Sequence, residues 1–279
     1  MRFTKMHGLG NDYVYVNAFE ETIVDPAALA VRISDRHFGV GSDGLVMICP
    51  SETADFRMRM FNADGSEGDM CGNASRCVAK YVYERGMTDK ATVTLETPAG
   101  IKTLMMTVEE GVVTGVRVDM GEPKVACQDV PCLLGEGVVK MAPIEALGRI
   151  FYITPVCTGN PHGVIVLDEP VEDFPLEIYG PVLERHPAFP KRANIEFVNV
   201  ISRDRLRMRV WERGSGVTLA CGTGSCAVLV ACHLNGLCER RAAVVLDGGE
   251  LVNEWDEATG HVFMNGPATF VFDGEYKHP

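Results

Sequence analysis

The sequence predicts an α+β fold built from two homologous domains. Two observations lead to this fold class. Predicted strands far outnumber predicted helices and do not alternate with them, which argues against a doubly wound parallel sheet. In addition, short motifs recur in the same order at about half of the 279-residue length, as expected for a duplicated unit.

The predicted strands are short, rich in β-branched residues and bounded by Gly, Asp or Asn, a pattern typical of strands. In chain order they are Asp12–Ala18, Gly44–Cys49, Phe56–Phe61, Ala91–Glu96, Lys102–Thr107, Gly115–Asp119, Gly163–Leu167, Ile195–Ile201, Arg205–Trp211, Ala242–Leu246, His261–Met264 and Thr269–Phe272. Four helices are predicted from proline at their starts or glycine after their ends. They are Pro26–Phe38, Asn73–Arg85, Leu176–His186 and Ser225–Leu234.

The repeat consists of four motifs at nearly one offset. Each motif is short, but four in the same order are not a coincidence of composition. The pairs are Gly10-Asn11 with Gly159-Asn160, Arg36-His37 with Arg185-His186, Cys71-Gly72 with Cys221-Gly222, and Gly86 with Gly236. We therefore expect a first domain over residues 1–119, a second over 120–265, and a last segment, 266–279, that returns to the first domain.

The composition favours a small-molecule ligand. The chain has 26 Lys and Arg against 38 Asp and Glu, a formal net charge of −12. An acidic chain without a basic cluster is a poor match for nucleic acid or an anionic membrane surface. No secretory signal and no apolar run long enough to span a bilayer is present, so we expect a cytoplasmic protein.

The glycine and cysteine patterns exclude two common sites. Gly39-x-Gly41-x-x-Gly44 matches the dinucleotide fingerprint only as a pattern, because it follows a predicted helix and enters a strand, the reverse of the required order. The ten cysteines contain no C-x-x-C, so neither a zinc knuckle nor a thioredoxin motif is predicted. We expect no metal site, and most of the thiols to be buried as small hydrophobic groups.

Two cysteines stand apart because each precedes a predicted helix at equivalent positions of the repeat. Cys71-Gly72-Asn73 opens one helix and Cys221-Gly222-Thr223 opens the other. A helix start presents unpaired N–H groups and a partial positive charge. We expect this to lower the thiol pKa and to bind a carboxylate or phosphate. The alternative is a pair of capped core helices with incidental cysteines.

Two equivalent thiols on opposite sides of a cleft suit the inversion of a stereocentre. One thiolate removes a proton from one face, and one thiol delivers a proton to the other face. The helix starts would then stabilise the negative charge that develops when the α-proton leaves.

Several segments together resemble the diaminopimelate epimerases over nearly the whole chain. They are Lys5 to Asp12, Phe61 to Glu67, Met70 to Asn73, Gly159 to His162, Arg192 to Ile195, Glu212 to Gly214 and Ala220 to Gly224. The resemblance implies two barrel-like domains, each a mostly antiparallel sheet wrapped around a central helix. It also implies a homodimeric enzyme without cofactor that interconverts LL- and meso-diaminopimelate for lysine and peptidoglycan biosynthesis.

The resemblance also assigns roles to individual residues. Cys71 and Cys221 resemble the acid/base pair, and His162 and Glu212 resemble the groups that help these thiols to exchange protons. The residues that resemble substrate contacts are Asn11, Asn62, Gly72, Asn73, Asn160, Asn194, Glu212, Arg213, Gly222 and Thr223. Neutral amide side chains suit the zwitterionic end of an amino acid, and the guanidinium group of one arginine suits a carboxylate at its second charged end.

Three residues depart from the family pattern, and other functions remain open. Ala74, Gly44 and Cys157 stand where many members carry other residues. The main alternative is a related cofactor-independent racemase for proline, hydroxyproline or histidine. A thiol–disulfide oxidoreductase, a non-catalytic anion-binding protein and a pyridoxal enzyme are further alternatives.

Overall fold

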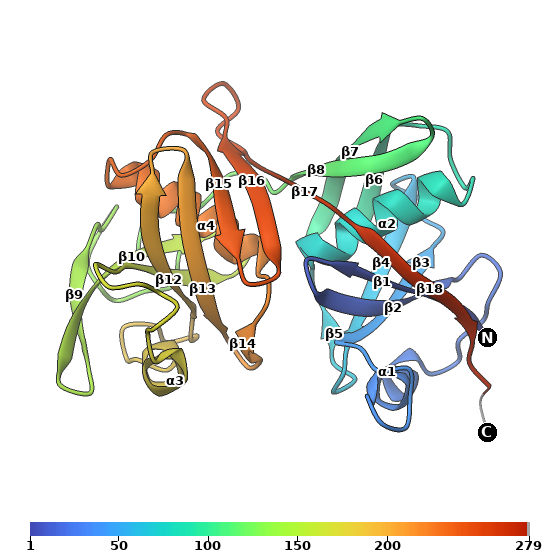
Figure 1. Cartoon of the computed structure of the whole chain (residues 1–279), viewed down its shortest axis with the longest axis horizontal. Helices are drawn as coiled ribbons and strands as arrows, with labels where there is room; N and C mark the ends of the chain where they lie inside the picture. The colour runs from blue at the N-terminus through green and yellow to red at the C-terminus, as the bar shows by residue number, and fades with distance from the viewer. Residues whose placement is uncertain (278–279) are drawn as a thin grey trace. The chain divides into compact units, whose positions relative to one another are not determined.

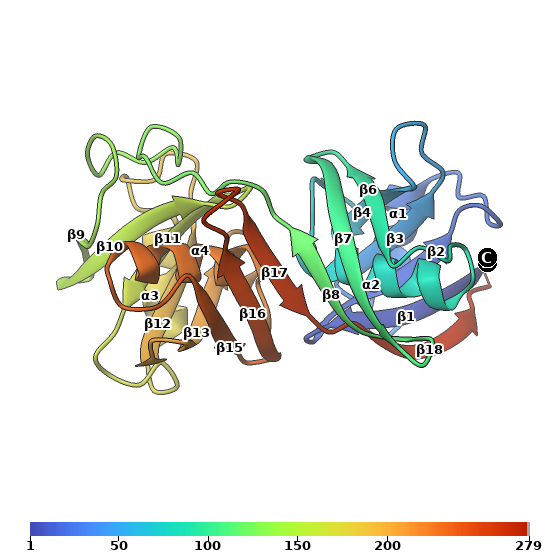
Figure 2. The ribbon, with the colours of Figure 1, turned by 90° about the horizontal axis from the view of Figure 1, so that it is seen from above.

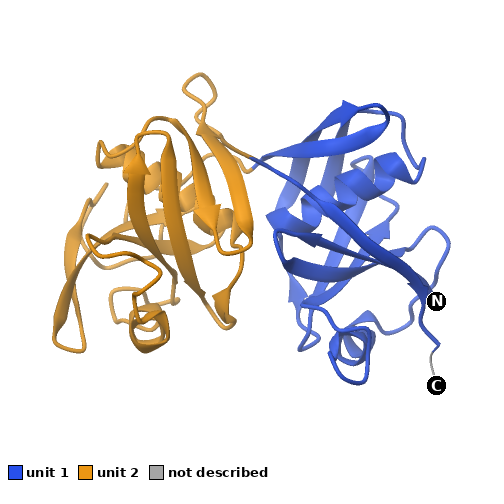
Figure 3. Cartoon of the chain, in the orientation of Figure 1, with its two compact units in different colours: residues 1–119, 265–279 blue, residues 120–264 orange. Residues whose placement is uncertain are grey.

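A computed structural model describes residues 1–277 of the chain. The chain forms two compact units (Figure 3). Unit 1 contains Met1–Asp119 and the segment from Asn265 onward, and unit 2 contains Met120–Met264. Each unit has its own set of paired strands and its own buried helix.

Unit 1 is a curved sheet that encloses one helix. Its strands are β1 (Arg2–Gly8), β2 (Asn11–Asn17), β3 (Gly44–Cys49), β4 (Phe56–Asn62), β5 (Glu67–Gly68), β6 (Thr92–Thr97), β7 (Gly100–Glu109), β8 (Val112–Asp119) and β18 (Thr269–Glu275). They pair in the order β18-β1-β2-β3-β4-β6-β7-β8, with β5 beside β4. Only the β2–β3 and β4–β6 pairs are parallel. Helix α2 (Gly72–Glu84) packs against β1, β2, β7 and β8 (Figures 1 and 2).

Unit 2 repeats this arrangement. Its strands are β9 (Ala142–Ala146), β10 (Arg149–Cys157), β11 (Pro161–Val166), β12 (Asn194–Ser202), β13 (Arg205–Glu212), β14 (Gly216–Thr218), β15 (Arg241–Leu246), β16 (Gly249–Trp255) and β17 (Val262–Gly266), whose last two residues belong to unit 1. The β11–β12 and β13–β15 pairs are parallel, like their counterparts in unit 1. Helix α4 (Gly222–Leu234) packs against β10 to β13, β15 and β16.

The two central helices are buried for different reasons. Helix α4 is apolar on all sides, and Cys226–Cys232 is entirely buried, as the absence of charge there predicted. Helix α2 also buries Arg76 and Lys80. Arg76 donates to the carbonyl oxygen of Pro267, and Lys80 donates to Glu84 and to the carbonyl oxygen of Val113. The buried cations are therefore satisfied by hydrogen bonds.

Two smaller helices lie outside the central ones. They are α1 (Pro26–Ser34) in unit 1 and α3 (Leu176–Glu184) in unit 2. The predicted helix Pro26–Phe38 was too long at its end. Asp35 accepts hydrogen bonds from the backbone N–H groups of His37 and Phe38, and such side-chain bonds compete with continuation of a helix.

The predicted fold class is confirmed: each unit is a mostly antiparallel sheet wrapped around a central helix. The strands β1, β5, β9, β10, β14 and β16 were not predicted. Strand β1 escaped prediction because it contains Lys5, which is buried and paired with Asp12 at 2.5 Å. Among the helices of residues 1–277, none has the length and apolar character to cross a bilayer.

Candidate functional site

Cys71 is the N-cap residue of α2. Its sulfur accepts a hydrogen bond from the backbone N–H of Ala74 at 3.4 Å and donates one to Oδ1 of Asn11 at 3.4 Å. Asn73 also donates to Oδ1 of Asn11, at 3.3 Å. Strand β2 thus brings Asn11 to the start of the helix, next to the thiol, and the helix begins one residue earlier than the predicted Asn73, with Cys71 as its cap.

The side chain of Asn73 is held in place by a residue of the next turn of α2. Its Oδ1 accepts a hydrogen bond of 2.8 Å from Nη2 of the buried Arg76. Strand β1 approaches closely here, since a Cβ at Gly8 would lie 3.0 Å from Cβ of Asn73. Gly8 therefore permits the contact between β1 and the first turn of α2.

A charged network supports Asn11 from the side opposite to Cys71. Nδ2 of Asn11 donates to Asp43 at 2.8 Å, and Arg36 bridges Asp43 and Asp12 at 3.1 and 2.8 Å. Burial and the neighbouring Asp12 raise the pKa of Asp43. The sequence did not identify Asp43 as part of the site. Asp43 fixes the amide so that its oxygen faces the thiol.

Asn62 lies at the end of β4, where its amide donates to Oγ of Ser66 at 3.0 Å. Across the β3–β4 ladder it pairs with Gly44. Asn62 is therefore held by the turn that follows its own strand, on the same sheet edge as Gly44.

Cys221 is the N-cap residue of α4 in unit 2. Its sulfur accepts a hydrogen bond of 3.3 Å from the backbone N–H of Gly224 and lies 3.5 Å from Oγ1 of Thr223. The side chain is almost fully buried. Gly222 is buried in the first turn, so α4 begins three residues before the predicted Ser225, directly after Cys221.

The expected lowering of the thiol pKa is wrong for Cys221. Burial raises its pKa well above the ordinary value, and the carboxylates of Glu212 and Glu196 raise it further. The hydrogen bonds from Thr223 and Gly224 oppose this rise but are weaker. The prediction considered the helix start alone, and the two carboxylates come from other strands, β13 and β12.

His162 is the centre of a buried polar cluster. Its Nδ1 lies 2.6 Å from Oε1 of Glu196, and its Nε2 lies 2.8 Å from Oδ1 of Asn160. Nδ2 of Asn194 lies 3.5 Å from Nδ1. His162 and Glu196 are both inaccessible to solvent. Strands β11 and β12 bring these residues together because His162 and Asn194 are partners in the parallel ladder.

Glu212 and Arg213 end strand β13. Glu212 accepts a hydrogen bond from Thr218 and is hydrogen-bonded to Cys221. Burial raises the pKa of Glu212, while Thr218 and the neighbouring His162 oppose the rise. The backbone N–H of Arg213 donates to Oδ1 of Asn194 at 2.7 Å, and the exposed guanidinium donates to the carbonyl oxygen of Lys191 at 3.0 Å.

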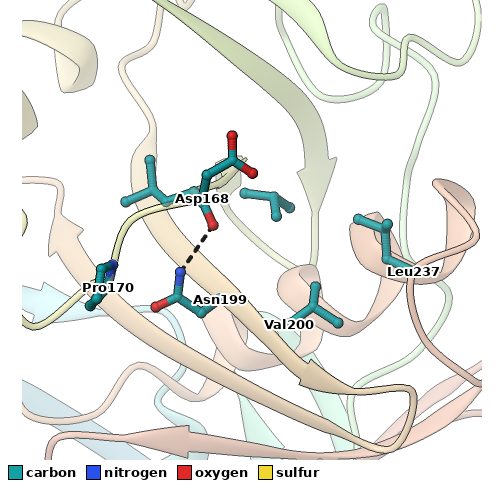
Figure 4. A pocket seen from close by; sticks show the side chains of 7 residues that line it. Asp168, Pro170, Asn199, Val200 and Leu237 are labelled. Atoms are coloured by element: carbon teal, nitrogen blue, oxygen red, sulfur yellow. Dashed lines mark hydrogen bonds between the residues drawn. The ribbon is translucent and has the colours of Figure 1, made fainter.

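The surface pocket of unit 2 does not belong to this cluster. Figure 4 shows its lining side chains, which come from the end of β11 and the segment after it, from β12 and from the segment after α4. Its lining residues are Val166, Leu167, Asp168, Pro170, Asn199, Val200 and Leu237. None of the predicted site residues is among them. Within residues 1–277, no group of three or more His, Cys, Asp or Glu side chains is arranged to hold a metal ion.

Comparison with known proteins identifies the family. The sequence model described as diaminopimelate epimerase matches residues 3–126 and 154–271. The chain belongs to the diaminopimelate epimerase family. A diaminopimelate epimerase of Acetivibrio thermocellus is 59% identical over 275 residues, covering 99% of this chain and 98% of the relative. One of Methanococcus maripaludis (strain C5) is 55% identical, covering 99% of both chains.

Solved structures show the same fold at low identity. A PhzF-family phenazine biosynthesis protein of Bacillus anthracis has a TM-score of 0.69 at 18% identity, covering 100% of this chain and 99% of its own. A hydroxyproline epimerase from Agrobacterium vitis has a TM-score of 0.70 at 16% identity, covering 98% and 91%. Membership of the diaminopimelate epimerase family confirms the predicted resemblance and the predicted enzyme class, an isomerase.

Proposed function

We propose that the chain inverts one α-carbon of LL-diaminopimelate to give meso-diaminopimelate, using Cys71 and Cys221 as acid and base without a cofactor. The observation that carries the proposal is the equivalence of the two thiols. Each caps a 13-residue buried helix, and each sulfur accepts the backbone N–H three residues later. Relatives that are 51–59% identical are named diaminopimelate epimerases, which supports the substrate.

The reaction needs one proton removed and one proton supplied. In one direction the thiolate of Cys71 takes the α-proton, and the thiol of Cys221 gives its proton to the opposite face of the planar carbanion. In the reverse direction the two sulfurs exchange roles. The backbone N–H groups at the starts of α2 and α4 would bind the α-carboxylate and stabilise the charge that develops on it.

The residues around Cys221 support its role as the proton donor of the resting enzyme. Burial, Glu212 and Glu196 keep its pKa high, so at neutral pH the group is a thiol. Glu212 is hydrogen-bonded to this thiol and lies near His162. After the sulfur has given its proton, Glu212 and His162 would return one to it from solvent.

The remaining predicted residues would hold the substrate. Gly72, Asn73, Gly222 and Thr223 belong to the first turns of α2 and α4, where the α-carboxylate would bind. Asn11, Asn62, Asn160 and Asn194 would bind polar groups of the amino acid as neutral donors and acceptors. Arg213, exposed at the end of β13, would bind the carboxylate of the non-reacting end.

The cellular setting follows from the same assignment. We propose a cytoplasmic enzyme on the route to lysine and peptidoglycan that assembles as a homodimer. All ten cysteines are free, which fits a reducing compartment. Light scattering of the purified protein measures the assembly, and a monomer at micromolar concentration would contradict the dimer.

Solvent isotope exchange tests the activity directly. The reduced protein, without added metal or pyridoxal phosphate, is incubated with LL-diaminopimelate in deuterated water, and the α-proton is followed by NMR. We expect deuterium at one α-carbon together with formation of the meso isomer. Absence of exchange would overturn the proposal. Exchange with proline, hydroxyproline or histidine, but not with diaminopimelate, would assign the chain to a related racemase.

A further inference from the structure

Glu196 is a fully buried carboxylate that helps to raise the pKa of Cys221, and the family resemblance assigns it no role. It lies in β12, two residues after Asn194, in an otherwise apolar run from Ile195 to Val198. Burial of a carboxylate is costly unless the charge is paired. A glutamate at this position is therefore expected to have a function that compensates for its cost.

The carboxylate has one partner on one oxygen. Oε1 lies 2.6 Å from Nδ1 of His162, whereas Oε2 is buried without a hydrogen-bond partner among the described residues. A glutamate kept only for structural stability would be expected to have both oxygens satisfied. The single strong contact indicates that the role of Glu196 is exerted on His162.

His162 meets an oxygen at each ring nitrogen. Glu196 faces Nδ1, and Oδ1 of Asn160 faces Nε2 at 2.8 Å. An imidazole donates from a nitrogen that carries a proton, so two oxygen acceptors fit the doubly protonated ring. With no solvent access to the ring, Glu196 supplies the negative charge that such a ring requires.

Gly224 brings the carboxylate close to the start of α4. A Cβ at position 224 would lie 2.8 Å from Oε1 of Glu196 and 3.1 Å from the sulfur of Cys221. Glycine at this position therefore leaves the space that the carboxylate occupies. The Glu196–His162 pair is consequently packed directly against the turn that carries the thiol.

The first unit lacks this pair at the equivalent positions. In the β2–β3 ladder Tyr13 pairs with Gly44 and Tyr15 with Val46, as His162 pairs with Asn194 and Val164 with Glu196 in the β11–β12 ladder. Val46 thus takes the place of Glu196. Ala74 takes the place of Gly224, which fits the absence of a carboxylate that would need the space. The asymmetry confines the charged pair to the unit of Cys221.

We propose that Glu196 is a positioning residue for the epimerisation: its carboxylate orients the imidazole of His162 and holds a proton on Nδ1. The ring then presents Nε2 to Asn160 and keeps its positive charge near Glu212 and Cys221. Only the expected effect of Glu196 on the reaction rate rests on the proposed function. The geometry of the pair can be measured independently of activity.

The spectroscopic test uses Glu196→Gln in the full chain. In the wild type we expect a downfield Nδ1–H proton resonance that His162→Gln removes, which assigns it. Glu196→Gln should abolish this resonance or shift it upfield. An unchanged resonance in Glu196→Gln would overturn the proposal, whether or not the protein epimerises diaminopimelate.

The kinetic test uses Glu184→Gln as a matched control. Glu184 is also buried in unit 2, but it pairs with Trp211 and Arg192. We expect Glu196→Gln to lower kcat about 10–100-fold, the range for loss of a group that orients a functional histidine, with little change in KM. Glu184→Gln should leave both constants unchanged. The double variant Glu196→Gln with His162→Gln should be no slower than His162→Gln alone.

The pH profile of kcat distinguishes a role of Glu196 in positioning His162 from a role in the stability of the fold. The groups that face the pair are Cys221 on α4, Glu212 on β13 and Asn160 before β11. Loss of the Glu196 carboxylate should change the pH profile of kcat, because the imidazole beside Glu212 is then no longer held in place. Wild-type kcat and an unchanged profile in Glu196→Gln would overturn the role, while a wild type without any exchange would overturn the proposed function instead. If Glu196→Gln does not fold, Gly224→Ala displaces the same carboxylate and is tested by the same resonance.

Discussion

Cys71 and Cys221 occupy the same position in their units, and Cys221 lies beside two carboxylates. Both sulfurs accept a hydrogen bond from the first turn of their helix, at 3.4 and 3.3 Å. Cys71 donates to the neutral amide oxygen of Asn11. Cys221 is buried and has the carboxylates of Glu212 and Glu196 beside it, and its pKa is raised by burial first and then by these two groups. The duplicated fold therefore holds two thiols that are equal in placement but unequal in burial.

This inequality predicts different alkylation rates. Cys71 is partly exposed, whereas Cys221 is buried and its pKa is raised. At pH 7 iodoacetamide should modify Cys71 first, because Cys71 is the more accessible thiol and because the raised pKa of Cys221 disfavours its reactive thiolate form. Modification of Cys221 should increase as the pH rises toward its raised pKa. Glu212→Gln removes one of the carboxylates and should speed the modification of Cys221 at a given pH.

Mass spectrometry of peptides after timed alkylation measures both rates. Cys49, partly exposed at the end of β3, provides an internal reference within unit 1. Faster labelling of Cys221 than of Cys71 at pH 7 would contradict the inferred difference.

Removal of either thiol should stop epimerisation in both directions. In the proposed mechanism each sulfur is base in one direction and acid in the other, so Cys71→Ala and Cys221→Ala should each lower kcat about 10²–10⁴-fold, the usual contribution of a positioned acid or base. Cys49→Ala is the control and should keep full activity. Optical assays from LL- and meso-diaminopimelate provide the two rates. Full activity in either of the first two variants would refute the two-thiol mechanism.

The positions of Cys71 and Cys221 at helix starts could be predicted from the sequence because the evidence for them is local. A cysteine and a glycine before a helix specify a capping residue, and the recurrence of the pair 150 residues later identifies its equivalent. The burial of α4 follows in the same way from its uncharged sequence. A local sequence pattern does not predict the burial of a residue that is stabilised by a partner elsewhere in the chain. Lys5 is buried in β1 because Asp12 pairs with it.

At the site, Glu196 and the raised pKa of Cys221 also could not be predicted from local sequence patterns. In the sequence, Glu196 is a single charge within an apolar strand and gives no indication of its partner. Only the parallel pairing of β11 with β12 places it beside His162. The direction of the thiol pKa shift was predicted wrongly because Cys221 is buried and because Glu212 and Glu196 approach it from positions 9 and 25 residues earlier in the chain.

Glu212 should reduce stability at neutral pH. Its folded-state pKa is raised, mainly by burial, so between the unfolded value of 4.5 and the folded value the native state binds more protons than the unfolded state. Stability contributed by this group is therefore full below pH 4.5 and is lost as the pH rises through the folded pKa. Glu212→Gln should raise the melting temperature at pH 8 more than at pH 4.5, and should lower activity.

Thermal unfolding followed by circular dichroism at both pH values measures the effect. Glu250→Gln, at an exposed ion pair with Arg205, is a suitable control because its carboxylate is well solvated. An equal change of melting temperature at pH 4.5 and pH 8 in Glu212→Gln would show that its ionisation does not affect folding.

Arg213 should bind the non-reacting end of the substrate. Arg213→Lys keeps the charge but loses the planar fork that binds a carboxylate through two hydrogen bonds. We expect binding to weaken by about 1.5–3 kcal/mol, the range for charge-assisted hydrogen bonds, with KM rising more than kcat falls. Arg205→Lys, at the opposite end of β13 and paired with Glu250, is the control. Unchanged KM and kcat in Arg213→Lys would exclude this role.

Oxidation should join the two catalytic thiols. If both sulfurs flank one α-carbon, only substrate separates them, and the empty enzyme should form a Cys71–Cys221 disulfide once their Cα atoms come within about 7 Å. With hydrogen peroxide as oxidant, two thiols lose two protons and two electrons, and the peroxide is reduced to two molecules of water.

Activity should fall with the appearance of the linked peptide and return with dithiothreitol, because a disulfide is a reversible oxidation state. Bound substrate should slow the loss. Peptide mapping decides the matter: inactivation traced only to Cys157 or Cys226 would refute the proposed placement of the two thiols.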